Sequence, residues 1–211
     1  MLTVALPKGR LLPPVLRCLL QAGVSLAAEV QSSPRRLVFQ DGLWRLVVVK
    51  DADVPAYVEQ GVADLGFVGL DQILEHGGDV LRLLPMNFGH CRLCLLALAN
   101  GNGLPTSRPL RLATKYPRLA RKLLAERGLW AEVIKLSGSV ELAATLKLAD
   151  VVLDLVETGQ TLKENGLVIL ETWLSVVPYL VVNRGMWETS GEETKAAVAR
   201  LGGAYEDRGS Q

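Results

Sequence analysis

The sequence has too few cysteines for a disulfide framework and no excess of either charge. Only three of its 211 residues are cysteine, and an odd number of cysteines does not describe a set of paired bridges. Cys91 and Cys94 have a CxxC spacing, but no second pair of ligands accompanies them, so we interpret them as small buried apolar residues. The 23 basic and 22 acidic residues nearly cancel, which argues against a nucleic-acid-binding protein and against a charged interaction tail.

Long hydrophobic runs are also missing. The most apolar run, residues 93–99, is much too short to span a bilayer. The N-terminal segment lacks the basic-then-apolar order of a secretory signal, because Lys8 interrupts its apolar residues early. We therefore expect a soluble cytoplasmic protein with no membrane and no nucleic-acid partner. Hydrophobic residues make up 49% of the chain, which is enough to build a core.

Strand-like and helix-like patterns alternate along the chain, which is typical of an α/β protein with mostly parallel sheets. Strands are predicted at residues 2–6, 37–40, 45–50, 64–68, 93–99, 110–113, 132–136, 151–156 and 175–183. Helices are predicted at residues 11–22, 54–60, 117–127, 140–148 and 191–201, the last ended by Gly202 and Gly203. The glycine- and proline-rich stretch 100–109 is a candidate for a crossing between two parts of the fold.

Two segments resemble one another. Residues 54–64 and 140–150 share their Val, Ala and Asp positions, and each is predicted to run from a helix through Ala-Asp into a buried strand. This repeat indicates two lobes built on one plan with a cleft between them. Ligands of such proteins bind in the crevice at the carboxyl ends of the strands.

The segment 151–161 carries the clearest chemical signal. An apolar strand delivers Asp154 and then enters a turn with Thr158, Gly159 and Thr161 before a short helix. Backbone N–H groups and hydroxyls in such a turn can hold a phosphate, and a carboxylate just before it suits the two hydroxyls of a ribose. Together they predict a 5-phosphoribosyl site. The alternative is an ordinary strand–turn–helix with a threonine N-cap, but a carboxylate in an apolar strand is costly without a function.

Other polar residues follow the predicted strands. The plain interpretation of Ser137-Gly138-Ser139 is a helix cap, with Glu141 able to face the cleft. Basic residues near strand ends would counter the charge of a pyrophosphate and a triphosphate; they are Lys8, Arg10, Arg35, Arg36, Lys50 and Arg92.

Five segments, in order, resemble the ATP phosphoribosyltransferases: residues 5–11, 53–58, 63–69, 137–141 and 154–162. The last resembles the family signature, and the resemblance covers Leu2 to about Asn183. It implies a two-lobed fold like the type II periplasmic binding proteins, with the active site in the cleft. Lobe I would hold residues 1–92 and 178–211, and lobe II would hold residues 93–177 with the phosphoribosyl-pyrophosphate loop.

The resemblance also implies the reaction. ATP and phosphoribosyl pyrophosphate would give N1-(5-phosphoribosyl)-ATP and pyrophosphate with Mg²⁺, at the first step of histidine biosynthesis. The length fits the short form of the family, which lacks a C-terminal regulatory domain. Such a chain is expected to form a homo-oligomer with a regulatory subunit resembling histidyl-tRNA synthetase.

The roles of single residues are expectations from the same resemblance. Asp154 would bind the ribose hydroxyls, and the 5-phosphate would bind the loop of Glu157, Thr158, Gly159, Gln160 and Thr161. Arg10, Arg35 and Lys50 would act catalytically on the pyrophosphate or the ATP phosphates, with Lys8, Gly9 and Glu141 in the substrate site. Two positions depart from the family. Lys50 stands where arginine is common and lacks its fork, and Lys147 stands where glycine is common, with only local packing consequences expected.

Three other functions remain open from the sequence. A solute-binding module would share the fold. A conventional purine or pyrimidine phosphoribosyltransferase would share the phosphate loop, but it would have two adjacent acidic residues before it, whereas Asp154 and Glu157 are three apart. A catalytically silent interaction subunit is the third, and the intact loop argues against it.

Overall fold

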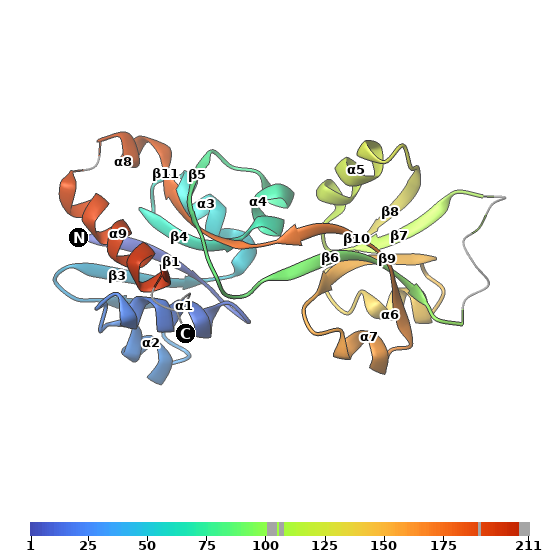
Figure 1. Ribbon diagram of the computed structural model, residues 1–211, viewed down its shortest axis with the longest axis horizontal. Coiled ribbons are helices and arrows are strands. Elements are labelled where there is room, and N and C mark those ends of the chain that lie inside the picture. Colours follow the sequence, from blue (N-terminus) through green and yellow to red (C-terminus); the bar gives the residue numbers. More distant parts are fainter. Residues whose placement is uncertain (101–104, 106–107, 190, 207–211) are drawn as a thin grey trace. The chain divides into compact units, whose positions relative to one another are not determined.

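The chain forms two compact units. The colours of Figure 1 follow the sequence through both of them. The computed structural model describes residues 1–100, 105, 108–189 and 191–206. Unit 1 consists of Met1–Gly89 and Val177–Gln211, and unit 2 consists of His90–Val176. The sequence places the first boundary after residue 92, inside strand β6 (Cys91–Leu98), but β6 belongs wholly to unit 2 because it pairs with strands of that unit.

The crossing expected at residues 100–109 is wrong. This stretch lies between β6 and β7 (Leu110–Thr114), and both strands belong to the sheet of unit 2. The chain has therefore crossed before β6 begins. Residues 101–104 and 106–107 of this stretch lie outside the described residues.

In the described part of unit 1, one six-stranded sheet has the order β2-β3-β1-β4-β11-β5. Its strands are β1 (Leu2–Pro7), β2 (Val38–Gln40), β3 (Trp44–Val49), β4 (Leu65–Gly69), β5 (Val80–Pro85) and β11 (Pro178–Asn183). Strands β3, β1 and β4 run parallel, whereas β2 and β11 are antiparallel to their neighbours. Successive side chains of β1 point to opposite faces of the sheet, and those of residues 3–7 are all buried, so both faces are covered.

Helices cover both faces of this sheet (Figure 1). One face packs against α1 and α9 in the main hydrophobic cluster, and the other packs against α3 in a smaller cluster of valines and alanines. The helices of unit 1, including the 3-10 helix η1, are α1 (Leu12–Gln21), α2 (Ala27–Ser32), η1 (Asp51–Asp53), α3 (Val54–Glu59), α4 (Leu70–His76), α8 (Arg184–Thr189) and α9 (Glu192–Glu206).

In the described part of unit 2, a five-stranded sheet has the order β10-β6-β9-β7-β8. Besides β6 and β7 it contains β8 (Ala131–Lys135), β9 (Val151–Val156) and β10 (Leu167–Val176). Helix α5 (Pro117–Glu126) lies on one face, and α6 (Glu141–Thr145) and α7 (Gln160–Glu164) lie on the other (Figure 1). These elements confirm the α/β class.

The two units share one plan. In unit 1 the parallel strands β3, β1 and β4 are followed by β11 and β5, and in unit 2 the parallel strands β8, β7 and β9 are followed by β6 and β10. The registers agree, because Val4 lies beside Leu65 in unit 1 as Leu112 lies beside Val151 in unit 2. The repeat seen in the sequence is therefore a repeat of topology, with β2 added in unit 1.

The shared Ala-Asp pair has a structural role in both units. The carboxylate of Asp64 accepts a hydrogen bond from the Thr3 N–H (2.7 Å), and the Asp64 N–H donates to the Thr3 carbonyl (2.9 Å). Asp150 makes the same two bonds to Arg111, each 2.9 Å long. Each aspartate thus fastens the start of one parallel strand to the start of the next.

The structure corrects the bounds of two predicted elements and supports the interpretation of the cysteines. The strand predicted at 175–183 is two strands in two sheets, because β10 ends at Val176 and β11 begins at Pro178. The last helix continues past Gly202 to Glu206, and a Cβ at Gly202 would lie 3.1 Å from Leu84, so a close contact explains this glycine. All three cysteines are buried free thiols, which confirms their apolar interpretation. Across the described residues, no helix is long and apolar enough to cross a membrane.

Candidate functional site

Unit 1 brings basic side chains together at the carboxyl ends of its parallel strands. Pro7 and Val49 lie side by side at the ends of β1 and β3, so Lys8 and Lys50 leave the sheet next to each other. The Lys8 N–H donates to the Val49 carbonyl (2.7 Å), which fixes this edge. Both lysine side chains are exposed and can meet an anion.

The turn after β1 uses glycine conformation and an arginine contact. Gly9 has a φ of 89°, which favours glycine. Helix α1 offers few backbone donors here, because Pro13 and Pro14 have no N–H. Binding of an anion at this edge therefore depends on side chains. The Arg10 Nη1 donates to the Gly89 carbonyl (3.0 Å) at the end of the first segment of unit 1.

Arg35 lies at the same edge as Lys50. Strand β2 is antiparallel to β3, and the Val48 N–H donates to the Leu37 carbonyl (2.8 Å), so the turn before β2 lies beside the end of β3. Arg35 is exposed and makes no hydrogen bond or ion pair within the described residues. The neighbouring Arg36 is held by the Val38 carbonyl (2.8 Å) and stacks over Phe39. Arg35 is therefore the more available of the two.

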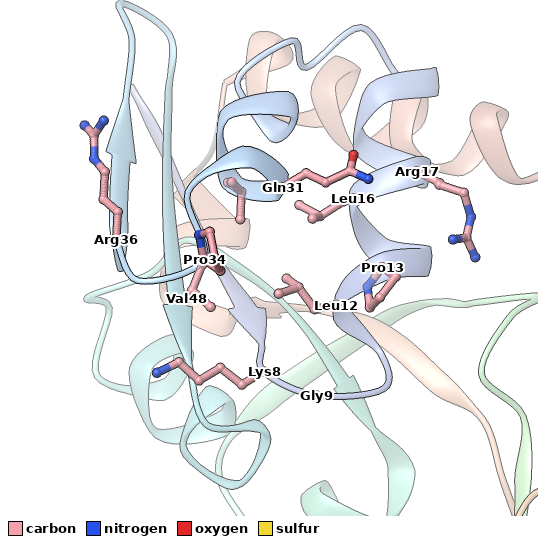
Figure 2. A pocket seen from close by; sticks show the side chains of 11 residues that line it. Lys8, Gly9, Leu12, Pro13, Leu16, Arg17, Gln31, Pro34, Arg36 and Val48 are labelled. Carbon is pink, nitrogen blue, oxygen red and sulfur yellow. The ribbon is translucent and has the colours of Figure 1, made fainter.

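A pocket of about 500 Å³ adjoins this edge (Figure 2). Its walls are aliphatic side chains and prolines of α1, α2 and β3, and its polar lining comes from Lys8, Arg17, Gln31 and Arg36. Figure 2 shows Lys8 and Gly9 at one end of the pocket. With basic and no acidic side chains in its lining, the pocket suits a ligand with an apolar body and an anionic group.

Unit 2 places Asp154 at the carboxyl end of its parallel strands. The register of β7 and β9 pairs Thr114 with Leu153, so the next residues, Lys115 and Asp154, are neighbours. The Lys115 Nζ lies 3.9 Å from the Asp154 Oδ2, and the Asp154 side chain is 19% exposed. Lys115 was not selected from the sequence. It could have been found as a basic residue two positions after a predicted strand, like Lys8.

The turn that follows β9 contradicts the threonine-cap alternative. Gly159, not a threonine, occupies the N-cap position of α7 with a φ of 77°, and the Thr158 hydroxyl accepts only a long hydrogen bond from the Gln160 N–H (3.5 Å). A Cβ at Gly159 would meet only Val156, at 3.9 Å, so backbone conformation rather than space requires the glycine. Thr158 and Thr161 are both exposed, and the turn therefore presents two hydroxyls to solvent.

The capping interpretation of Ser137-Gly138-Ser139 is also wrong. The N-cap of α6 is Val140, and no side-chain hydrogen bond caps the helix. Ser139 has a φ of 46°, in the left-handed region. This segment follows β8, and the Leu136 N–H donates to the Thr114 carbonyl (2.9 Å), so it lies at the same edge of the sheet as Lys115. Glu141 begins α6 beside it and is half-buried.

The candidate residues thus form one group in each unit. Unit 1 gathers Lys8, Gly9, Arg10, Arg35 and Lys50, and unit 2 gathers Glu141, Asp154, Glu157, Thr158, Gly159, Gln160 and Thr161 at the ends of its parallel strands. A site shared by the two units stays a prediction. Among the described residues, no group of three His, Cys, Asp or Glu side chains could hold a metal ion by itself.

The sequence matches a family model described as ATP phosphoribosyltransferase over residues 50–203. A relative named ATP phosphoribosyltransferase from Campylobacter curvus is 39% identical over 194 residues, which cover 92% of each chain. Another of the same name, from Marinobacter nauticus, is 41% identical over 210 residues and covers 98% of this chain and 97% of its own.

Two solved structures resemble the chain in fold. A chain of the ATP phosphoribosyl transferase (HisG:HisZ) complex from Thermotoga maritima superposes with a TM-score of 0.85 and 32% identity, covering 98% of this chain and 100% of that one. The alkanesulfonate-binding protein SsuA from Xanthomonas axonopodis superposes with a TM-score of 0.59 and 16% identity, covering 96% of this chain and 72% of that one. The second likeness confirms a fold related to periplasmic binding proteins.

Proposed function

The chain belongs to the ATP phosphoribosyltransferase family, and from this premise we propose how its two groups of residues divide the reaction. The enzyme transfers the 5-phosphoribosyl group of phosphoribosyl pyrophosphate to N1 of ATP, at the first step of histidine biosynthesis. We place this reaction in the cytoplasm.

The group in unit 2 binds the phosphoribosyl part. The single observation that supports this most strongly is Asp154 near the end of β9, followed by a turn with a left-handed Gly159 and two exposed threonines. The hydroxyls and the turn's N–H groups donate to the 5-phosphate. The Asp154 carboxylate accepts from the ribose hydroxyls. Glu141 lies at the same edge, beside the ribose.

The group in unit 1 carries the opposite charge and acts on the leaving group and the ATP phosphates. Four exposed cations lie at the edge of the sheet where β1 and β3 end, namely Lys8, Arg10, Arg35 and Lys50. As the bond from C1 of the ribose to the pyrophosphate oxygen breaks, negative charge grows on the pyrophosphate, and these cations stabilise it. They would also hold the triphosphate of ATP.

The chemistry needs no general base. Adenine N1 attacks C1 with a lone pair that it already has, and the pyrophosphate leaves with the electrons of the broken C–O bond. Positioning and electrostatic stabilisation therefore supply the catalysis. Mg²⁺ would neutralise pyrophosphate charge. Asp154 and Glu157 offer the oxygen ligands that it prefers, while no described cluster would hold it without substrate oxygens.

We also propose a partner subunit. The Thermotoga maritima structure is a complex with HisZ, and we infer a homo-oligomer of this chain with a similar subunit that resembles histidyl-tRNA synthetase. The test mixes the purified chain with ATP, phosphoribosyl pyrophosphate and Mg²⁺, with and without that subunit, and detects phosphoribosyl-ATP by absorbance and mass. A higher rate with the subunit supports the assembly, and an equal rate contradicts a role for it in activity.

Asp154→Ala tests the assignment of the ribose site. The variant should lose activity by about a hundredfold or more, because it removes the acceptor for both hydroxyls. Glu126→Ala, which removes an exposed carboxylate of α5, is the control and should retain wild-type activity. An Asp154→Ala enzyme within about threefold of wild type, with an unchanged melting temperature, would overturn the assignment.

A further inference from the structure

We infer that Lys115 is a positioning residue of this reaction, which holds the Asp154 carboxylate and balances its charge for the anionic phosphoribosyl pyrophosphate. The inference rests on the proposed role of Asp154. It adds a residue that neither the family resemblance nor the sequence pattern singled out.

The backbone forces Lys115 and Asp154 together. Thr114 and Leu153 are partners in the parallel pairing of β7 and β9, so the next residue of each strand lies at the same level. Side chains of a strand alternate between faces, and Ala113 and Val152, two residues earlier, both belong to the cluster that packs against α6. Lys115 and Asp154 therefore project from the same face of the sheet.

Thr114 fixes the backbone beside this pair. It is fully buried, its hydroxyl donates to the Leu153 carbonyl (2.7 Å), and it accepts a hydrogen bond from the Tyr116 N–H (3.0 Å). Thr114 is thereby attached to the strand that carries Asp154, and Tyr116, on the other side of Lys115, is attached to Thr114. These bonds fix the level of the Lys115 backbone relative to Asp154, and from there the Lys115 Nζ reaches to 3.9 Å from the Asp154 Oδ2.

Charge gives the reason for a cation here. The proposed residues of unit 2 include three carboxylates, those of Glu141, Asp154 and Glu157, and no cation. Phosphoribosyl pyrophosphate is highly anionic, so these three carboxylates would repel it unless cations offset them, and Arg92 lies beside Val156 at the end of β9. Lys115 adds positive charge directly beside Asp154. Its side chain is 40% exposed, which leaves donors of the ammonium group open to the substrate.

The repeat shows that the fold does not need this pair. The matching registers place Pro7 of β1 where unit 2 has Lys115, and Val68 of β4 where unit 2 has Asp154. Both residues are buried and neither is charged. The aspartate that fastens the strands, by contrast, is present in both units. A polar pair that only one copy of the scaffold carries is therefore better explained by chemistry than by folding.

The test uses the full chain and three variants. Lys115→Met keeps much of the side-chain volume and removes the charge, and Lys115→Arg restores the charge. Lys122→Met is the matched control, because Lys122 also faces a carboxylate at 3.9 Å, that of Glu126, but on the exposed surface of α5. For each variant the kcat, the KM for each substrate and the melting temperature are measured.

For Lys115→Met we expect the KM for phosphoribosyl pyrophosphate to rise about tenfold, because about one charge-assisted contact is lost. The kcat should also fall. The KM for ATP should change less than about twofold, and Lys115→Arg should recover most of the loss. A purely structural role would lower the melting temperature without changing this KM. The inference is wrong if Lys115→Met behaves like Lys122→Met while Asp154→Ala is inactive. If Asp154→Ala is active, the proposed ribose site itself is wrong.

Discussion

Asp150 offers a quantitative test of the contacts that hold unit 2 together. Its carboxylate accepts two hydrogen bonds from the Arg108 guanidinium (2.6 and 2.7 Å) and one from the Arg111 N–H (2.9 Å). The Arg108 hydrogen bonds are the largest cause that holds the Asp150 pKa well below its ordinary value, and the Arg111 backbone bond adds to them. The carboxylate is 13% exposed, so its replacement by an uncharged amide should destabilise the folded state. We expect Asp150→Asn to lower the free energy of unfolding at pH 7 by about 2–3 kcal/mol.

The dependence on pH follows from the sign of this shift. A depressed pKa in the folded state stabilises the protein above the unfolded pKa of about 3.8, and this contribution is lost as the pH falls below that value. At pH 3 the unfolded state takes up a proton that the folded state does not. The loss is then about 1.2 kcal/mol, from an unfolded pKa of about 3.8 and a folded pKa far below 3. The stability gap between wild type and Asp150→Asn should narrow by that amount.

Urea unfolding, monitored by the hydrogen exchange of the β9 amides, measures the stability of unit 2. The β1 amides serve as an internal reference in unit 1. Asp64→Asn is the matched control, because Asp64 occupies the same place in the repeat but accepts one backbone hydrogen bond. We expect a cost of about 1 kcal/mol for this variant, confined to unit 1. A gap between wild type and Asp150→Asn that stays constant from pH 7 to pH 3 would refute the reasoning.

Four further outcomes can be measured. Lys147→Gly should stabilise the protein by about 1 kcal/mol in urea unfolding, because Lys147 has a φ of 59°; a loss would contradict this. Gly89→Ala should cost about 1–3 kcal/mol more than Gly128→Ala, since both have left-handed φ values but only a Cβ at Gly89 would clash with Leu11; equal costs would count against the clash. Burial raises the pKa of Cys18 to about 11, so its thiol should react with a disulfide reagent at pH 8 only after denaturation. Lys50→Arg should strengthen product inhibition by pyrophosphate about threefold through its forked donors, and unchanged inhibition constants would place the pyrophosphate elsewhere.

Central strands could be predicted well from the sequence, and edge elements could not. Strand β9 has the predicted bounds, because a strand buried on both faces is a continuous apolar run. The edge strands β5 and most of β10 were missed, since each is partly exposed and its pattern is interrupted by charged or polar residues. Helices α2 and α4 were also missed. Each is only six or seven residues long, and a period is hard to recognise over that length, whereas the equally short α3 was predicted with the help of the glycine that follows it, Gly61.

The candidate site was predictable where a residue type is unusual for its element. Asp154 stands out in an apolar strand. Lys115 could not be paired with it, because the pairing depends on the register of two strands that are far apart in sequence. The backbone conformation at Lys147 could not be predicted either. Its replacement of the family's common glycine was expected to affect packing, whereas the structure shows a left-handed backbone position that ends α6.

The duplicated scaffold also supports the proposal that the two units bind different parts of the substrates. Matching registers place Lys8 of unit 1 where unit 2 has Tyr116, and Lys50 where unit 2 has Ser137. The strand ends of unit 1 thus carry several cations, which suit pyrophosphate and triphosphate groups. Those of unit 2 carry hydroxyls and Asp154 with Lys115 beside it, which suit a ribose phosphate. The aspartates that fasten the strands are the same in both units, whereas the residues beyond the strand ends differ. In this protein, positions where the two copies agree therefore support the fold, and positions where they disagree at the strand ends are the ones to examine for catalysis.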